Sequence, residues 1–138
     1  MTVMATRALE MQHDEDPKLV IQREWALYSA SYPQVMGARL IVGVYRRPEK
    51  LKSGIILSDK SRDEDNYQGR VGLVLAMGPL AFVEDDRHSW PGRHPQVGDW
   101  IGFRVGDTSP FLLPNGRHCR FVEDVAVQVI LSDPDHIL

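Results

Sequence analysis

The sequence predicts an all-β domain that follows a short helical extension. Residues 39–138 contain ten of the eleven glycines and seven of the nine prolines, spaced between runs rich in β-branched residues. Such regular turn residues between short apolar runs are typical of strands joined by tight connections. Residues 1–36 contain no glycine. We therefore divide the chain into an extension over residues 1–36 and a β domain over residues 37–138.

The extension is expected to contain one helix that begins at Pro17. Asp16 can accept a hydrogen bond as N-cap, and Pro17 suits the first helical position because its missing N–H would be unpaired there. Further apolar side chains follow at the spacing i, i+4, i+7 and form one stripe: Ile21, Trp25 and Tyr28. The stripe either covers an open end of the β domain or contacts another protein. The surplus of apolar residues on this helix hints at a second contact surface.

The β domain contains five or six apolar runs of strand length. They span residues 39–45, 69–77, 98–105, 109–113, 118–122 and 125–131. The pair Asn115-Gly116 favours a tight hairpin between the fourth and fifth of these runs. Short strands without an intervening helix predict a small closed or partly open barrel, because closure removes strand edges that would otherwise aggregate.

Composition and charge exclude several classes of protein. The net charge of the 138-residue chain is −3, which makes a nucleic-acid partner unexpected because phosphate backbones attract basic proteins. The single cysteine, Cys119, excludes an internal disulfide framework. The chain has no signal-peptide pattern and no apolar run long enough for a membrane span. These features predict a soluble, cytoplasmic protein that does not bind membranes.

No motif indicates catalysis, a metal or a cofactor. His88 and His94 lie near Asp85 in a Pro- and Gly-rich stretch, but a metal site would need further ligands on rigid elements. Cys119 follows His118, and adjacent strand residues point to opposite faces, so we expect a buried inert thiol instead of a reactive pair. We therefore expect a protein that is not an enzyme, with no cofactor and no metal site.

One connection is too long for a compact domain. Residues 46–68 separate the first two strong strands, and connections of this length without structure of their own are uncommon. Both ends of this segment are highly charged, whereas its middle carries an apolar triplet after a glycine: Gly54, Ile55, Ile56 and Leu57. The triplet is either a short strand folded onto the domain or an anchor for a partner.

From Tyr32-Pro33 to its C-terminus the sequence resembles the GroES-type co-chaperonins. Five motifs in the family's order carry the resemblance: RLIV at 39–42, SGIIL at 53–57, QGRV at 68–71 with AMG at 76–78, VGDWI at 97–101 and SDPDHIL at 132–138. The resemblance implies a small, irregular GroES-like β-barrel that assembles into a homo-oligomeric ring. In the family this ring caps an ATP-driven chaperonin and assists protein folding without hydrolysing anything itself.

The resemblance also implies roles for individual residues. Gly54, Ile55, Ile56 and Leu57 correspond to the mobile loop, which binds a groove between two helices of the chaperonin. A second hairpin, here residues 78–96, would form the roof of the ring and carry an acidic run and a tryptophan: Glu84, Asp85, Asp86 and Trp90.

Four features depart from the family pattern. They are the extension, Ser53 in place of the first glycine of the loop pair, the length of the roof segment, and the end of the chain at Leu138, where the family usually continues into a final strand. Added segments suggest a phage protein, which would act in the host cytoplasm. The alternative is a GroES-like fold reused as a decoration or cement protein of a phage capsid, located in the virion. The helix stripe Ile21, Trp25 and Tyr28 would then contact capsid proteins.

Overall fold

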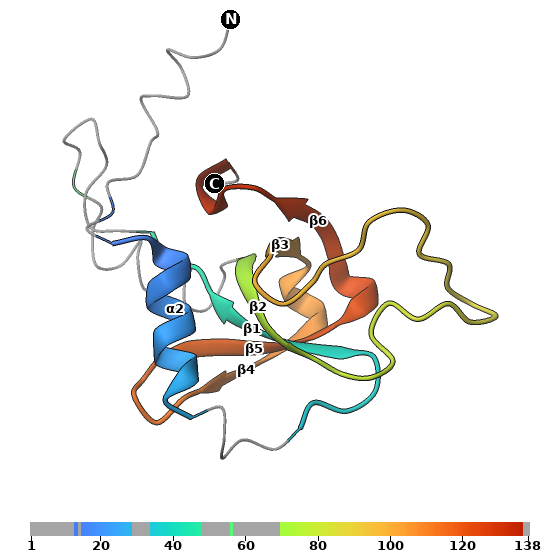
Figure 1. Cartoon of the computed structure of the whole chain (residues 1–138), viewed down its shortest axis with the longest axis horizontal. Coiled ribbons are helices and arrows are strands. Elements are labelled where there is room, and N and C mark those ends of the chain that lie inside the picture. Colours follow the sequence, from blue (N-terminus) through green and yellow to red (C-terminus); the bar gives the residue numbers. More distant parts are fainter. Residues whose placement is uncertain (1–12, 14, 29–33, 48–55, 57–69, 137–138) are drawn as a thin grey trace, which may run out of the picture.

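The computed structural model describes residues 13, 15–28, 34–47, 56 and 70–136 of the chain (Figure 1). Within these residues, helix α2 (Pro17–Ala26) precedes six strands: β1 (Arg39–Val44), β2 (Val71–Met77), β3 (Trp100–Phe103), β4 (Thr108–Leu112), β5 (His118–Glu123) and β6 (Val127–Leu131). Three short 3-10 turns lie at Val105–Asp107, Asp124–Ala126 and Pro134–His136. No helix in this part of the chain is both long and apolar enough to cross a membrane.

The six strands form one antiparallel sheet in the order β4-β5-β1-β2-β3-β6. The prediction of a mostly β protein with one short helix near the N-terminus is therefore confirmed. Strands β4 and β6 are the two edges, and the described residues do not pair them with each other. The sheet is not closed, so of the two predicted alternatives the closed barrel is not observed, and a GroES-like barrel stays a prediction.

The sheet is covered on both faces. One face carries side chains that pack beneath helix α2, and they include Ile41, Leu73, Leu75, Trp100 and Cys119. The opposite face carries the second half of the core, which includes Leu40, Val42, Val74, Ile101, Phe103 and Val122. Because alternate residues of a strand point to opposite faces, five of the six residues of the central strand β1 are buried.

Helix α2 begins as its sequence predicts and lies on the chain's own sheet. The Asp16 carboxylate accepts a hydrogen bond from the Lys18 amide at 3.0 Å, and Pro17 is the first helical residue. Ile21 is only 2% exposed and fits over Gly43 of β1, where a Cβ atom would overlap its Cγ2 methyl. Trp25 and Tyr28 pack against the same cluster. The exposed apolar side chains of this region are Leu19 and Leu27.

The two long connections of the domain leave from opposite ends of the central strands. Strands β1 and β2 are antiparallel partners, paired from Leu40↔Met77 to Val44↔Gly72. Residues 45–70 join them at the end where β1 stops, and residues 78–99 leave at the other end, where β2 stops. The described starting points of the two connections therefore lie at opposite ends of β1 and β2.

Candidate partner-binding site

The connection between β1 and β2 carries the predicted partner contact. Of the four residues assigned to it, the structure describes Ile56, which is 67% exposed and forms an isolated β-bridge. Gly54, Ile55 and Leu57 lie outside the described residues. An exposed isoleucine fits an anchor better than a core position, but its contact with a partner stays a prediction.

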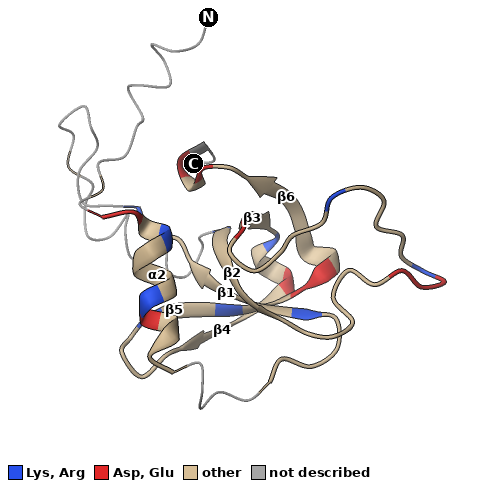
Figure 2. Cartoon of the chain, in the orientation of Figure 1, with Lys and Arg blue, Asp and Glu red and all other residues tan. Residues whose placement is uncertain are grey.

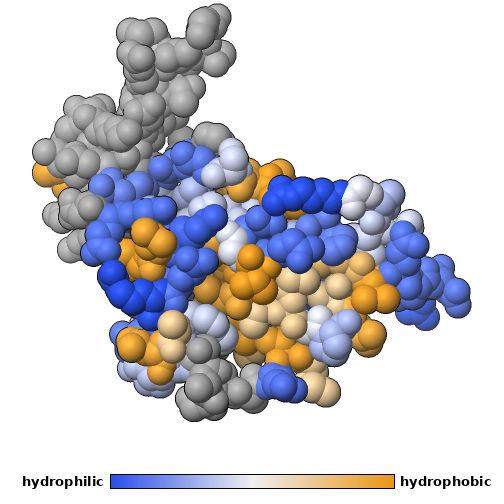
Figure 3. All heavy atoms as spheres, viewed as in Figure 1, coloured by the Kyte–Doolittle hydropathy of each residue, from blue (hydrophilic) through white to orange (hydrophobic). Residues whose placement is uncertain are grey.

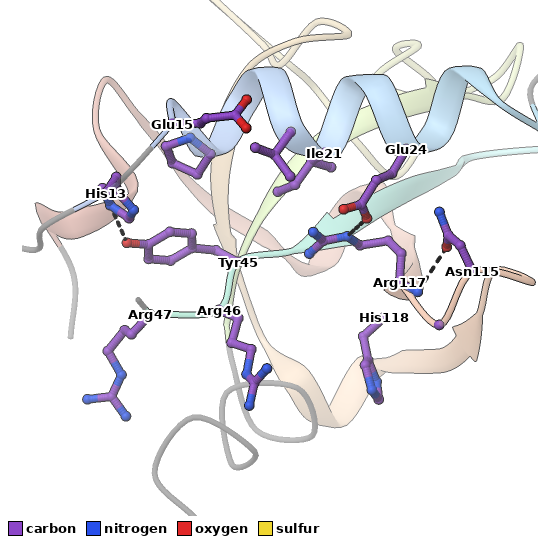
Figure 4. Close-up of a pocket in the computed structure, with 13 residues that line it drawn as sticks. His13, Glu15, Ile21, Glu24, Tyr45, Arg46, Arg47, Asn115, Arg117 and His118 are labelled. Carbon is purple, nitrogen blue, oxygen red and sulfur yellow. Dashed lines mark hydrogen bonds and ion pairs between the residues drawn. The ribbon is translucent and has the colours of Figure 1, made fainter. Parts of the chain in front are cut away.

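A cavity of about 520 Å³ lies where this connection begins. One wall is helix α2 with the residues before it, a second is the end of β1, and the third is the β4–β5 hairpin (Figure 4). Its lining residues are His13, Glu15, Pro17, Val20, Ile21, Glu24, Tyr45, Arg46, Arg47, Asn115, Gly116, Arg117 and His118. The first residues of the connection, Tyr45 to Arg47, therefore lie beside the extension at this cavity.

Two polar links hold the extension across this cavity. At one end, the Arg117 side chain donates from Nε to Glu24 Oε2 at 2.6 Å. At the other end, His13 Nε2 lies 3.0 Å from the Tyr45 hydroxyl and 3.2 Å from Asp135 Oδ2. The Tyr45 hydroxyl also donates to Asp135. Residues near both termini therefore meet at the residue that follows β1.

The hairpin turn places Arg117 at the cavity. Gly116 has a φ of 87°, which glycine adopts without steric cost. Its amide donates to the Leu113 carbonyl at 2.8 Å, and the Arg117 amide donates to the Asn115 side chain at 3.1 Å. The Asn115-Gly116 pair predicted from sequence thus forms a tight turn and fixes the start of β5.

The charged residues that line this cavity suit the binding of a ligand or partner. Its wall carries three arginines against two carboxylates, and one of these, Glu15, is bonded to Arg23 at 3.0 Å. The adjacent Cys119 is buried, and burial raises the pKa of its thiol to about 12, so the thiol is protonated at neutral pH. Within the described residues, no group of three or more His, Cys, Asp or Glu side chains could hold a metal ion.

Residues 78–99, which include the predicted roof hairpin, contain no strand before β3, and their role in a roof stays a prediction. Glu84, Asp85 and Asp86 are exposed on an irregular segment. The Asp85 carboxylate accepts hydrogen bonds from the Arg87 and His88 amides at 2.8 and 2.7 Å. These bonds to the charged form lower the pKa of Asp85.

Trp90 lies in this segment as a packing residue. Its ring contacts Phe82 edge to face, with ring centroids 5.1 Å apart, while His94 stacks on Phe82 at 5.4 Å. The Trp90 Nε1 atom is buried without a hydrogen-bond partner among the described residues. The predicted residues of the roof segment therefore split into an exposed acidic tip and a partly buried aromatic base.

Sequence reasoning missed the residues that build the cavity. The long connection begins with Tyr45, Arg46 and Arg47. Their position at its start was the signal that the sequence offered. Arg117 follows the predicted Asn-Gly turn, whereas no local pattern links His13 to Asp135, which is 122 positions away. In comparisons with known proteins, no family model and no curated sequence matches this chain.

Proposed function

We propose that this protein is a co-chaperonin of the GroES-like type, which binds an ATP-driven chaperonin through the segment around Ile56. The observation that carries the proposal is the connection between β1 and β2. These strands pair directly at Val44↔Gly72, so a tight turn could join them, yet residues 45–70 intervene. A segment that the sheet does not need, with an exposed isoleucine in it, supports a role in contacting a partner.

The strand order supports a homo-oligomer as part of the same proposal. An open sheet presents two edges that can pair with other chains. Edge strand β4 contains Pro110, which has no amide to donate, whereas β6 has no proline and exposes Val129. Strand β6 is therefore the edge that better suits pairing with a neighbouring copy, as a GroES-like ring would require.

The energetics favour several copies binding together. Burial of Ile55, Ile56 and Leu57 would contribute about 1.5–3 kcal/mol for each side chain. Ordering the segment costs about 1–2 kcal/mol per residue fixed, so a single copy binds weakly. Copies held in one assembly share a high effective concentration, so together they bind tightly while each contact can still release.

The test compares Ile56→Ser with Leu112→Ser. Both residues are exposed to a similar extent, 67% and 59%, but Leu112 belongs to the edge strand β4 and not to the connection. Native mass spectrometry of each variant with a purified tetradecameric chaperonin and ADP measures complex formation. We expect Ile56→Ser to abolish the complex and Leu112→Ser to retain it, with both variants unfolding at the wild-type temperature.

A wild-type chain that forms no complex with a chaperonin in either ADP or ATP would refute the proposal. The alternative, a GroES-like decoration protein of a phage capsid, would then be tested on the exposed face of the extension. Removal of the extension is unsuitable, because Ile21 belongs to the core. Leu19→Ser and Leu27→Ser change the side chains that are 58% and 70% exposed, and should weaken attachment to the capsid without unfolding the protein.

A further inference from the structure

An apolar groove lies at the end of the sheet opposite to the long β1–β2 connection. Its volume is about 350 Å³, and its apolar lining consists of Ala38, Leu80, Val83 and Val125. Leu80, Val83 and Val125 are 58%, 48% and 42% exposed. Asp85, His88, Glu123 and Asp124 complete the lining. In Figure 3 hydrophobic residues gather at the surface beside the hydrophilic tip of the 78–99 segment.

Backbone hydrogen bonds fix both walls of this groove. The Leu80 amide donates to the Gly37 carbonyl at 3.0 Å, and the Asp124 amide donates to the Ala38 carbonyl at 2.9 Å. Gly78 allows the closest approach of the two segments, because a Cβ atom there would overlap the Gly37 carbonyl. A groove whose walls are already in place loses little conformational entropy on binding.

A strained residue turns the apolar side chains outward. Phe82 has a φ of 59°, an outlier for a bulky residue, and it is only 5% exposed. Its ring packs between Trp90 and His94, and its amide donates to the buried Asp124 carboxylate at 3.0 Å. Strain of this kind persists only where the surroundings impose it, and it clusters at binding sites. Here it buries Phe82 while Leu80 and Val83, before and after it, stay exposed.

The rim of the groove is acidic. Glu123 forms an ion pair at 2.9 Å with Arg39, a residue that does not line the groove. Asp85 lies 3.3 Å from His88 Nδ1. Backbone hydrogen bonds keep the Asp85 carboxylate ionised by lowering its pKa. Glu84 and Asp86 add two exposed carboxylates beside it, and Arg87 adds one exposed cation. Figure 2 shows the acidic residues with the adjacent basic residue at the tip of the 78–99 segment. The groove therefore favours a cation next to an apolar group.

We propose that this groove binds an extended segment of another protein in which one or two large apolar side chains lie next to Lys or Arg. The volume is at the small end of ligand sites, which suits one or two side chains and no larger body. The proposal does not rest on chaperonin binding, because the residues that line the groove do not belong to the β1–β2 connection.

The test uses a short fluorescein-labelled peptide of sequence GKLVKG, with GELVEG and GKSSKG as matched probes. Fluorescence anisotropy with the full chain should show weak, saturable binding of the first peptide and none of the other two. Leu80→Ser should weaken this binding at least about tenfold, because it removes a buried apolar contact. Val97→Ser, at an equally exposed residue outside the groove lining (60%), should leave it unchanged.

A second variant tests the charge. Asp85→Asn keeps an oxygen that can accept from the Arg87 and His88 amides but removes the negative charge. It should weaken GKLVKG binding several-fold and reduce its dependence on salt. Equal binding of GELVEG, or unchanged binding by Leu80→Ser with a wild-type circular dichroism spectrum, would overturn the proposal. A wild-type dimer in sedimentation that Leu80→Ser dissociates would overturn it too, since a second copy would then be the occupant.

Discussion

The contact between Gly43 of β1 and Ile21 of helix α2 determines how the extension attaches to the sheet. Replacing Gly43 with alanine adds a methyl group that overlaps the Ile21 Cγ2 atom and lies 3.3 Å from the Leu75 Cδ1 atom. The φ of Gly43 is not in the left-handed region, so alanine is acceptable to the backbone. The expected loss of stability therefore comes from the collision with the helix.

The magnitudes follow from core substitutions of the same kind. Adding a methyl group to this packed core should lower the free energy of unfolding by about 1–3 kcal/mol. Ile21→Ala alone should lower it by about 2–5 kcal/mol. In the double variant the new methyl group occupies space that the isoleucine has vacated. We expect the double variant to lose less free energy of unfolding than the two single variants together, by about 1 kcal/mol or more.

Urea unfolding of the four proteins, followed by tryptophan fluorescence and circular dichroism, measures this coupling. Leu19→Ala is the matched control on the same helix, because Leu19 is 58% exposed and should contribute little to stability. Losses that add to within about 0.5 kcal/mol would contradict the reasoning. In that case the helix would not rest on Gly43.

Two further predictions concern groups near the cavity. The Cys119 thiol, whose pKa burial raises to about 12 from 9.0, stays protonated in the folded state. The stability that this pKa shift contributes is complete below about pH 9 and is lost as the pH rises toward about 12. Urea unfolding should therefore give a lower free energy of unfolding at pH 10 than at pH 7, and Cys119→Ala should lack the part of this difference that comes from the thiol. Arg117→Gln removes the bond to Glu24 and should lower the free energy of unfolding by about 1 kcal/mol, measured by the same method. Glu24→Gln should cause a similar loss, and the double variant should lose little more; additive losses would contradict a direct bond.

The strands could be predicted closely because local residues end each of them. The predicted run 109–113 corresponds to β4 at Thr108–Leu112, and Asn115-Gly116 forms the turn that follows. Whether the sheet closes into a barrel could not be decided in this way. It depends on strand curvature, to which irregularities such as the register shift between Ile41 and Val42 contribute. No short sequence pattern marks that shift.

The candidate site was only partly accessible to sequence reasoning. The length of the segment after Tyr45 was visible, because a count of residues reveals it. The cluster of His13, Tyr45 and Asp135 was not, because its members come from three distant segments. The exposure of Leu80 and Val83 depends on the positive φ of Phe82, a conformation that sequence reasoning assigns to glycine or asparagine.

The direct pairing of β1 with β2 makes the length of the segment between them almost free to vary. Loop-closure entropy grows with the logarithm of loop length, so doubling the segment would destabilise the fold by only about 0.6 kcal/mol. The register from Leu40↔Met77 to Val44↔Gly72 is set by side chains within the sheet. The pairing of β1 with β2 therefore does not depend on the length of the chain between them, so a new partner could be acquired without a new fold.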